Sequence, residues 1–337
     1  MWGFRRFRRE SGQALVLAAA AMVVILGMAA MAIDVGMFLQ ERRDLQNAAD
    51  AAALAGAPDL PGSPANAVDH ANSWAEQNGI GAGELEGVTV STTYVTDDTI
   101  TVQVKRDVPW LFARVLGRGS DTVRADATAR IGSPSVAFGV MPWSLLESAK
   151  AAATYGVEVT LKYSAQEGGG GEFGLLDLGG GSGCNSYRDN VTEGSQVTLH
   201  SQIPIEPGNC VGPTEQGLED RLAACSAECD TFEEVFTLVD GVWHFSSDAC
   251  NPWKPEGAAS TRVVLVPVIS DPDKGKEYVT VNSFAMVFLT NDATDNICPT
   301  GNACDVKAIY VKAYDDIGAL MGALDPNSDV RFARLVE

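Results

Sequence analysis

The chain is poor in histidine and in basic residues, and both shortages narrow the range of functions. Its 337 residues include 3 histidines, and 24 lysines and arginines stand against 44 acidic residues, which gives a formal net charge of −20 at pH 7. A nucleic-acid binder needs a positive surface to displace the counterions of the phosphates, so we expect no nucleic-acid partner. So few histidines also leave little material for histidine-based metal sites or acid–base catalysis.

Several catalytic and binding motifs are absent as well. The sequence has no HExxH, no Gly-x-Ser-x-Gly and no Cys-x-x-Cys, and neither glycine-rich stretch (168–171 and 179–183) is followed by Lys-Ser/Thr. These absences exclude the motif-defined zinc proteases, α/β-hydrolase nucleophiles, redox dithiols and P-loops. We therefore expect no catalytic residue, no metal, no cofactor and no small-molecule substrate, that is, a protein that is not an enzyme.

What the sequence does contain is one long apolar run. Residues 14–33 are 20 consecutive uncharged residues, and no second run of that length follows. As a helix they would span about 30 Å, the thickness of the hydrocarbon core of a bilayer. We expect a transmembrane helix at 14–33. A cleaved secretory signal is the alternative, with Ala30-Met31-Ala32 as its cleavage site, although signal cores have roughly 7–15 apolar residues.

Charges flanking this run indicate its orientation. Residues 1–13 carry four arginines against Glu10, whereas Arg42 and Arg43 are accompanied by Asp34 and Glu41 on the other side. The positive-inside rule places residues 1–13 in the cytoplasm as a basic head and the body outside. We expect a single-pass protein of the cell membrane in contact with membrane lipid.

The helical pattern continues beyond the apolar run. Residues 34–57 are rich in good helix formers, with apolar residues at three- and four-residue spacing, until Gly56 and Pro58. One helix is therefore expected from about residue 13 to 56. Its alanine-rich outer half allows close approach, either by the rest of the chain or by a partner helix.

Gly12-Gln13-Ala14, the apolar run, Asp34-Val35-Gly36 and the stretch from Leu45 to Gly56 resemble the N-terminal region of the TadE/TadG-like Flp (tight adherence) pilus-assembly family. The resemblance covers about residues 11–57. It implies a single-span, pilin-related envelope protein that acts in assembly or anchoring, with pilin-like or other pilus-assembly proteins as partners. The residues that carry this family signature are Asp34, Gly36, Leu45, Ala49, Asp50 and Ala53.

The body is expected to be α+β overall. Residues 34–132 read as a juxtamembrane helix and a small pilin-like α+β unit, with a helix at 65–77, a hairpin turning at 96–98 and a strand over 123–131. Between the hairpin and that strand we expect a short helix that begins at Pro109, ends at Gly117 and turns Leu111, Phe112, Val115 and Leu116 inward.

Residues 135–337 predict a mostly β, disulfide-containing domain. Alternating or continuous apolar runs indicate strands at 157–163, 173–178, 197–203, 235–239, 262–269, 279–289 and 307–314. Glycine-rich connections separate several of them.

All seven cysteines lie at or beyond Cys184, and a location outside the cytoplasm allows disulfides. Cys298 and Cys304 bracket a turn-forming loop and predict a local disulfide. Cys225 and Cys229 lie four apart on an expected helix, where Cβ atoms are about 5–6 Å apart, farther than the roughly 3.5–4.5 Å of a disulfide. They are expected to bond elsewhere, with Cys210 and Cys250 as candidates, and the connectivity stays open.

Two functions follow from these patterns. The first is an accessory or minor component in the assembly or anchoring of a Flp pilus. The second is a secreted or anchored carbohydrate-directed adhesin or enzyme with a cleaved signal, in which Trp143, Trp243 and Trp253 would form a sugar platform.

Overall fold

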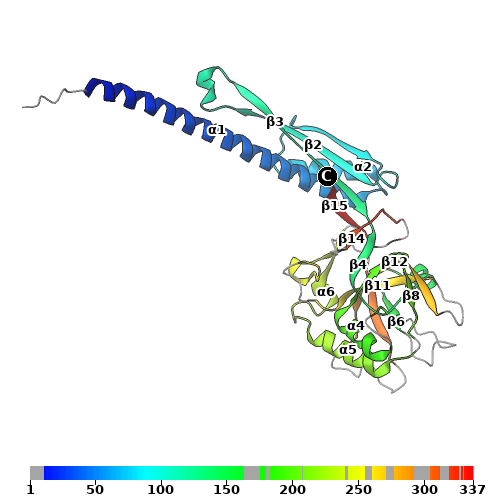
Figure 1. Cartoon of the computed structure of the whole chain (residues 1–337). Coiled ribbons are helices and arrows are strands. Elements are labelled where there is room, and N and C mark those ends of the chain that lie inside the picture. The colour runs from blue at the N-terminus through cyan, green and yellow to red at the C-terminus, as the bar shows by residue number, and fades with distance from the viewer. Residues whose placement is uncertain are drawn as a thin grey trace, which may run out of the picture.

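The computed structural model describes residues 11–162, 175–179, 183–206, 208–239, 242–254, 260–270, 277–291, 304–311, 319–325, 328 and 330–336. The fold is α+β, with one long helix projecting from a body of two sheets (Figure 1). Most of the expected basic head, residues 1–10, lies outside the described residues.

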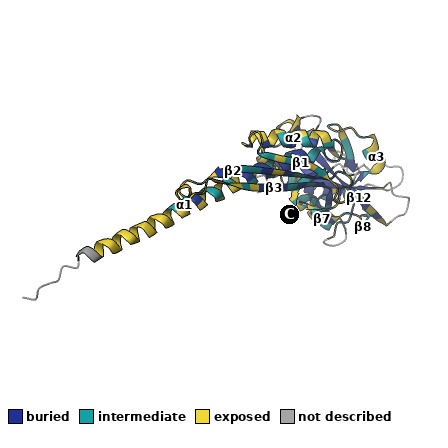
Figure 2. Ribbon diagram, turned by 90° about the horizontal axis from the view of Figure 1, so that it is seen from above, coloured by how far each residue is buried: buried dark blue, intermediate teal, exposed yellow. Residues whose placement is uncertain are grey.

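The long helix α1 runs from Ser11 to Gly56 without interruption, as the sequence predicts. From residue 14 to residue 33 its side chains are exposed at every position except the half-buried Ala30. Figure 2 shows this exposed half projecting from the body and the remaining half buried against it. The helix ends at Gly56, where a 3-10 turn, η1 (Ala57–Asp59), takes over with Pro58 in it.

A four-stranded antiparallel sheet, called here the helix-side sheet, packs on the outer half of α1. Its strands, in spatial order, are β1 (Leu85–Ser91), β2 (Thr99–Pro109), β3 (Ser120–Gly132) and β15 (Phe332–Val336). The helix α2 (Pro64–Gln77) lies beside α1 on the same face. The shared core joins alanines of both helices to the inward residues of β2 and β3. The small side chains allow this close packing of helix on sheet.

The short helix expected between Pro109 and Gly117 is a wrong prediction. β2 continues to Pro109, which pairs with Ser120 of β3, and only a 3-10 turn, η2 (Ala113–Leu116), remains at the tip. Among the described residues no second layer covers this tip, and Leu111, Phe112 and Val115 are exposed rather than turned inward. The side chain of Leu116 lies outside the described part.

The second sheet, called here the distal sheet, has nine strands among the described residues, as the mostly β prediction requires. The main path is β14-β4-β11-β12-β13-β6, with β5, β7 and β8 pairing with β11, β4 and β12. The bounds are β4 Pro134–Val140, β5 Leu145–Leu146, β6 Glu158–Lys162, β7 Ser195–Thr198, β8 Gln202–Pro204, β11 Val263–Ile269, β12 Tyr278–Leu289, β13 Val306–Val311 and β14 Leu320–Met321.

Both faces of the distal sheet are covered. Along β11, Val263, Leu265 and Ile269 join one hydrophobic cluster, and Val264, Val266 and Val268 join the other. The first cluster includes residues of α6 (Phe232–Val235) and of the hairpin β9 (Phe236–Val239) and β10 (Val242–Phe245), and the second those of α4 (Cys184–Glu193) and α5 (Val211–Ala223). The short α3 (Glu147–Ala152) and η3 (Asp248–Cys250) complete the set. Burial on two faces explains why β11 reads as a continuous apolar run.

The chain passes between the two sheets twice. Ser133 alone separates β3 from β4, and the segment after β14 returns to β15, which pairs with β3. At this crossing Ser133 Oγ accepts a hydrogen bond of 3.0 Å from the Asp325 amide. The division expected at residues 132–135 stays a prediction, but the last strand of the chain lies in the helix-side sheet, away from the rest of 135–337.

Candidate functional site: the apolar helix and the hairpin tip beside it

Among the described residues, α1 is the one helix long and apolar enough to cross a membrane by length and composition. In its first half the large side chains from Leu15 to Ile33 are 48–72% exposed in the described structure. Such a surface is unfavourable in water and suited to lipid. A membrane anchor is therefore consistent with this half of α1.

The signature residues divide between two roles in the structure. Leu45, Ala49 and Ala53 follow one another at four-residue spacing and are fully buried under the helix-side sheet. Asp50 accepts a 2.8 Å hydrogen bond from Gln46 Nε2, which also lies 2.9 Å from the carbonyl oxygen of Asp126 in β3. These residues of the second half hold the body on the helix.

Asp34 and Gly36 lie farther along, where the apolar run ends. The Asp34 side chain is buried, and its carboxylate accepts hydrogen bonds from the backbone amides of Leu111 (3.0 Å), Phe112 (3.1 Å) and Ala113 (2.9 Å). Gly36 is exposed, with open space where a Cβ would lie. Asp34 therefore ties α1 to the tip of the β2–β3 hairpin, which runs beside the helix in Figure 1.

The protonation of Asp34 follows from these contacts. Burial alone would raise the pKa of this carboxyl, because the charged form loses water. The backbone hydrogen bonds from Ala113, Phe112 and Leu111 favour the charged form and outweigh burial, so the pKa is lowered from its usual value. Asp34 is therefore a carboxylate at neutral pH, and it gathers amides that the tip would otherwise leave unpaired.

Two further contacts hold the hairpin to α1. The ring of Phe38 stacks on that of Trp110 with centroids 4.1 Å apart. Arg106 of β2 binds Glu41 of α1 at 3.1 Å and Glu84 at 2.6 Å. Hydrogen bonding to Arg106 is the largest cause that lowers the pKa of Glu84, to about 2.

The partners of Asp34 at this junction are not apparent in the sequence. Asp34 and Gly36 stand out as signature residues, but nothing in their spacing indicates that a tip 77 residues away supplies the amides. The sequence predicts strands on either side of the tip but a helix between them. The pairing of β2 with β3 as far as Pro109, which brings Trp110 to Phe38, is therefore not indicated by the sequence.

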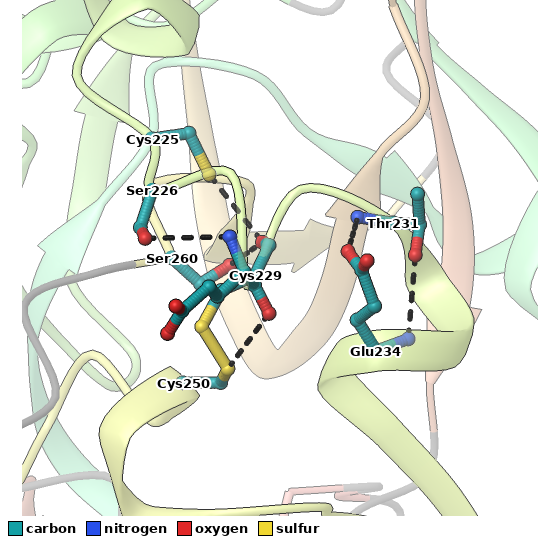
Figure 3. Close-up of a disulfide and its surroundings, with 8 residues drawn as sticks. Cys225, Ser226, Cys229, Thr231, Glu234, Cys250 and Ser260 are labelled. Atoms are coloured by element: carbon teal, nitrogen blue, oxygen red, sulfur yellow. Dashed lines mark hydrogen bonds between the residues drawn. A yellow bond between two sulfur atoms is a disulfide. The ribbon is translucent and has the colours of Figure 1, made fainter.

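The cysteines lie in the distal part. Cys184 is bonded to Cys210, and Cys229 is bonded to Cys250. Figure 3 shows the Cys225 thiol close to the second bridge, donating to the carbonyl oxygen of Cys229 at 3.4 Å. Cys225 is a free cysteine, so the prediction that it forms a disulfide is wrong. Cys225 precedes Cys229 by four residues, and its thiol contacts the carbonyl oxygen of Cys229 rather than a sulfur.

Of the predicted local disulfide between Cys298 and Cys304, the structure describes one cysteine. Cys304 is fully buried and disulfide-bonded. Cys298 lies outside the described residues.

A network of buried, hydrogen-bonded polar side chains lies under α5. Lys162 Nζ donates to Thr214 Oγ1 at 2.9 Å, Tyr187 Oη lies 3.1 Å from the same hydroxyl, and Trp143 Nε1 donates to Tyr187 at 2.6 Å. Burial lowers the pKa of Lys162 to about 8, with the Asp305 carboxylate acting against it. All four side chains are fully or almost fully buried. The network therefore connects α4, α5 and β6 inside the core.

Two other constellations lack the means to act as sites. Cys184, Cys210 and Glu206 bring their ligand atoms within 4.8 Å of one another, but the two sulfurs form a disulfide and are not thiolates. Trp143 is fully buried in one cluster of the distal sheet, whereas Trp243 and Trp253 pack on the other. The three tryptophans therefore do not share an exposed platform.

A hollow of about 380 Å³ lies between the loop at 177–179 and strands β7 and β8. Asp177 is the one ionisable residue among those that line it. A single carboxylate offers neither an acid–base pair nor a ligand set.

Comparison with known proteins agrees with the N-terminal resemblance. Residues 12–59 match the sequence model of the family described as Putative Flp pilus-assembly TadE/G-like. The match covers α1 and η1 and ends before α2 begins at Pro64. No curated protein and no solved structure matches the chain.

Proposed function

We propose that this chain is a non-enzymatic, single-pass membrane protein that acts as an accessory or minor component in the assembly or anchoring of a Flp pilus. The family match at residues 12–59 carries the proposal, because it falls on α1. Half of that helix is exposed and apolar, and half is the buried support of the body. The matched segment thus includes both the proposed anchor and the means of fixing the body to it.

The proposed topology has residues 1–13 in the cytoplasm and both sheets outside. The arginines that precede the apolar run favour this orientation. Two disulfides in the distal part also support it, because disulfides persist outside the reducing cytoplasm.

The proposed partners are membrane lipid and pilin-like or other pilus-assembly proteins, which would contact the exposed half of α1. Alanine and glycine are frequent there, and small residues let transmembrane helices approach closely. The buried half is occupied by the chain's own sheet and α2, so the partner would bind the lipid-facing half instead.

The test is site-specific photo-crosslinking of the full-length chain in cells that make the pilus. A photoreactive amino acid replaces Leu26, which is 62% exposed on α1, and the control replaces Leu320, which is 53% exposed on the distal sheet. We expect adducts with a pilus-assembly protein at Leu26 and not at Leu320, and loss of pili when the chain is deleted. Normal piliation after deletion, with only lipid adducts at Leu26, would refute the proposal.

A further inference from the structure

We propose that the tip of the β2–β3 hairpin, residues 110–119, inserts into the headgroup layer of the membrane that α1 crosses. The tip then forms a second membrane contact beside the helix. The inference rests on the proposed anchoring by α1 and adds to it a surface of the body that binds lipid.

The depth of the tip follows from the helix. Between Ile33, the last residue of the apolar run, and Phe38 the helix rises about 7.5 Å. The headgroup region on each side of a bilayer is about 5–8 Å thick, which is half of the difference between the whole bilayer and its hydrocarbon core. The Asp34 carboxylate binds the tip amides and Phe38 stacks on Trp110 within this interval. The contacts therefore hold the tip at headgroup depth.

The side chains of the tip suit that depth. Val115 is 89% exposed, Leu111 51% and Phe112 45%. On α1, Val35 and Leu39 follow directly after the two residues that contact the tip, Asp34 and Phe38, and are 45% and 53% exposed. Single exposed apolar residues are common on soluble proteins, but this group is held at the end of the exposed apolar run by Asp34. Lipid is the medium in which the whole surface would be covered.

The charge of the tip favours lipid over a basic protein partner. Residues 110–119 contain Arg114 and Arg118 and no acidic residue, in a chain whose net charge is −20. Arg118 is paired with Asp121, at the start of β3, at 3.2 Å. Arginine binds phosphate groups with two parallel hydrogen bonds, and Arg114 is exposed at the tip. Trp110 adds an indole of the kind that is enriched at membrane interfaces. The combination matches an anionic headgroup surface.

A second contact would also fix the orientation of the body relative to the membrane. A single helix leaves tilt and rotation to its flanking anchors. With Asp34 binding three tip amides and Phe38 stacked on Trp110, α1 and the helix-side sheet form one unit. Insertion of the tip then determines which face of the helix is turned toward the sheet and which toward neighbouring proteins.

The experiment measures the environment of a fluorescent label in full-length protein. Cys225 is first replaced by Ser so that its free thiol is not labelled, and Val115→Cys is labelled with an NBD maleimide without reduction. The protein is placed in nanodiscs of phosphatidylcholine and phosphatidylglycerol, with and without lipids that carry a nitroxide quencher near the headgroup. Thr96→Cys, exposed at the opposite end of the same sheet, is the matched control. The Cys225→Ser parent gives the background.

We expect the Val115 label to emit at shorter wavelength than the Thr96 label, to be quenched by the nitroxide lipid and to be shielded from iodide. Equal emission, iodide access and insensitivity to the nitroxide at both positions would overturn the inference. Shielding that depends on protein density and not on the nitroxide lipid would also overturn it, since a second copy would then cover the tip.

A third label separates this inference from the proposed anchoring. Ile25→Cys lies in the middle of the apolar run, and its label should be quenched by lipids with the nitroxide deep in the chain. If Ile25 is in lipid and Val115 is in water, the anchoring stands and the tip insertion is refuted. If Ile25 is also in water, the anchoring itself fails and the inference fails with it.

Discussion

Two buried aspartates bind the backbone amides of the loops at the two ends of the helix-side sheet. In the turn between β1 and β2, the Asp98 carboxylate accepts the amides of Thr93 (2.7 Å), Tyr94 (2.9 Å) and Val95 (3.0 Å). At the opposite end Asp34 accepts the amides of the β2–β3 tip. In both loops one carboxylate satisfies backbone donors that the strand ladder leaves free.

Replacing Asp98 by Asn should destabilise the sheet by about 2 kcal/mol, because hydrogen bonds to a charged group are each worth roughly 1.5–3 kcal/mol and the amide cannot accept all of them. The measurement is hydrogen exchange of peptides from β1 and β2 in full-length protein. Asp97→Asn, at the neighbouring position with a φ of 59° that Asn tolerates, is the control and should exchange as the parent does. Equal exchange in both variants would contradict the role of Asp98.

The same residue predicts a pH dependence. Burial acts to raise the pKa of Asp98, but hydrogen bonds from the amides of Val95, Thr93 and Tyr94 and from Thr99 lower it overall. The contribution of Asp98 is therefore complete above the unfolded value of about 3.9 and is lost as pH falls below it through the lowered folded pKa. The melting temperature of the parent should fall more steeply below pH 4 than that of Asp98→Asn, and parallel curves would contradict this.

The disulfide between Cys229 and Cys250 closes a loop with a sequence separation of 21. Replacing both cysteines by Ser should lower the stability of the distal part by about 3 kcal/mol, because the unfolded chain regains the entropy of that loop. Cys225→Ser, next to the bridge but free, should change stability by less than about 1 kcal/mol. Thermal unfolding without reductant measures both, and equal shifts would show that the bridge adds nothing.

At the scale of elements, the last turns of α1 pack on α2 and β2 through small side chains. A Cβ added at Gly56 would lie 2.5 Å from the carbonyl oxygen of Ala67 in α2 and 2.7 Å from Ile100 Cδ1 in β2. One of these neighbours is backbone and cannot rotate away. The close approach of α1, α2 and β2 thus depends on a glycine at the end of the helix.

Gly56→Ala should destabilise the helix-side sheet by about 1–3 kcal/mol, the usual effect of overpacking, and should increase hydrogen exchange in α2. Gly36→Ala in the same helix meets open space and should be neutral or stabilising by up to about 1 kcal/mol, because alanine is the better helix former. If Gly56→Ala were as stable as Gly36→Ala, the close contact would not be required.

The long elements were predictable because their periodicity is strong. The uncharged run 14–33, the stripe of Leu45 and the following alanines, and the alternating strands around Val102 and Ala127 all lie where their patterns place them. The tip was not predictable from the same rules. Leu111, Phe112 and Val115 are apolar and closely spaced, which indicates an inward face, but in the part of the chain that the structure describes no layer covers them.

At the scale of the whole molecule, the segment after β14 fastens the two sheets together. Leu324 is buried in the core of the helix-side sheet, whereas Phe332 is fully buried in a cluster of the distal sheet. The backbone of Phe332 pairs with Gly132 of β3 and its neighbour Ala333 packs on the helix-side core. Side chains of one short segment therefore belong to both cores.

Phe332→Ala should lower the free energy of unfolding by about 3–5 kcal/mol and should raise hydrogen exchange in β15 and at the end of β3, because a fully buried ring is removed at the joint. Leu335→Ala on the same strand is the control, since its side chain is 42% exposed, and its effect should stay below about 1 kcal/mol. A similar loss in both would place the stabilising contact elsewhere.

The pairing of β15 shows why sequence reasoning could not place the last strand. The segment 332–336 is short, and its pairing partners on β3, residues 128–132, lie about 200 residues earlier in the sequence. A local pattern carries no information on a partner at that distance. The pairing is set by which sheet edge is open once both sheets exist, in this case the free edge of β3.

This strand has a consequence for biogenesis. A ribosome delivers α1 and strands β1 to β3 early, yet the fourth strand of their sheet is residues 332–336. Until that segment emerges, β3 keeps an open edge that can pair with a foreign strand. The sheet nearest the helix, although begun first in synthesis, is therefore completed only when residues 332–336 pair with β3.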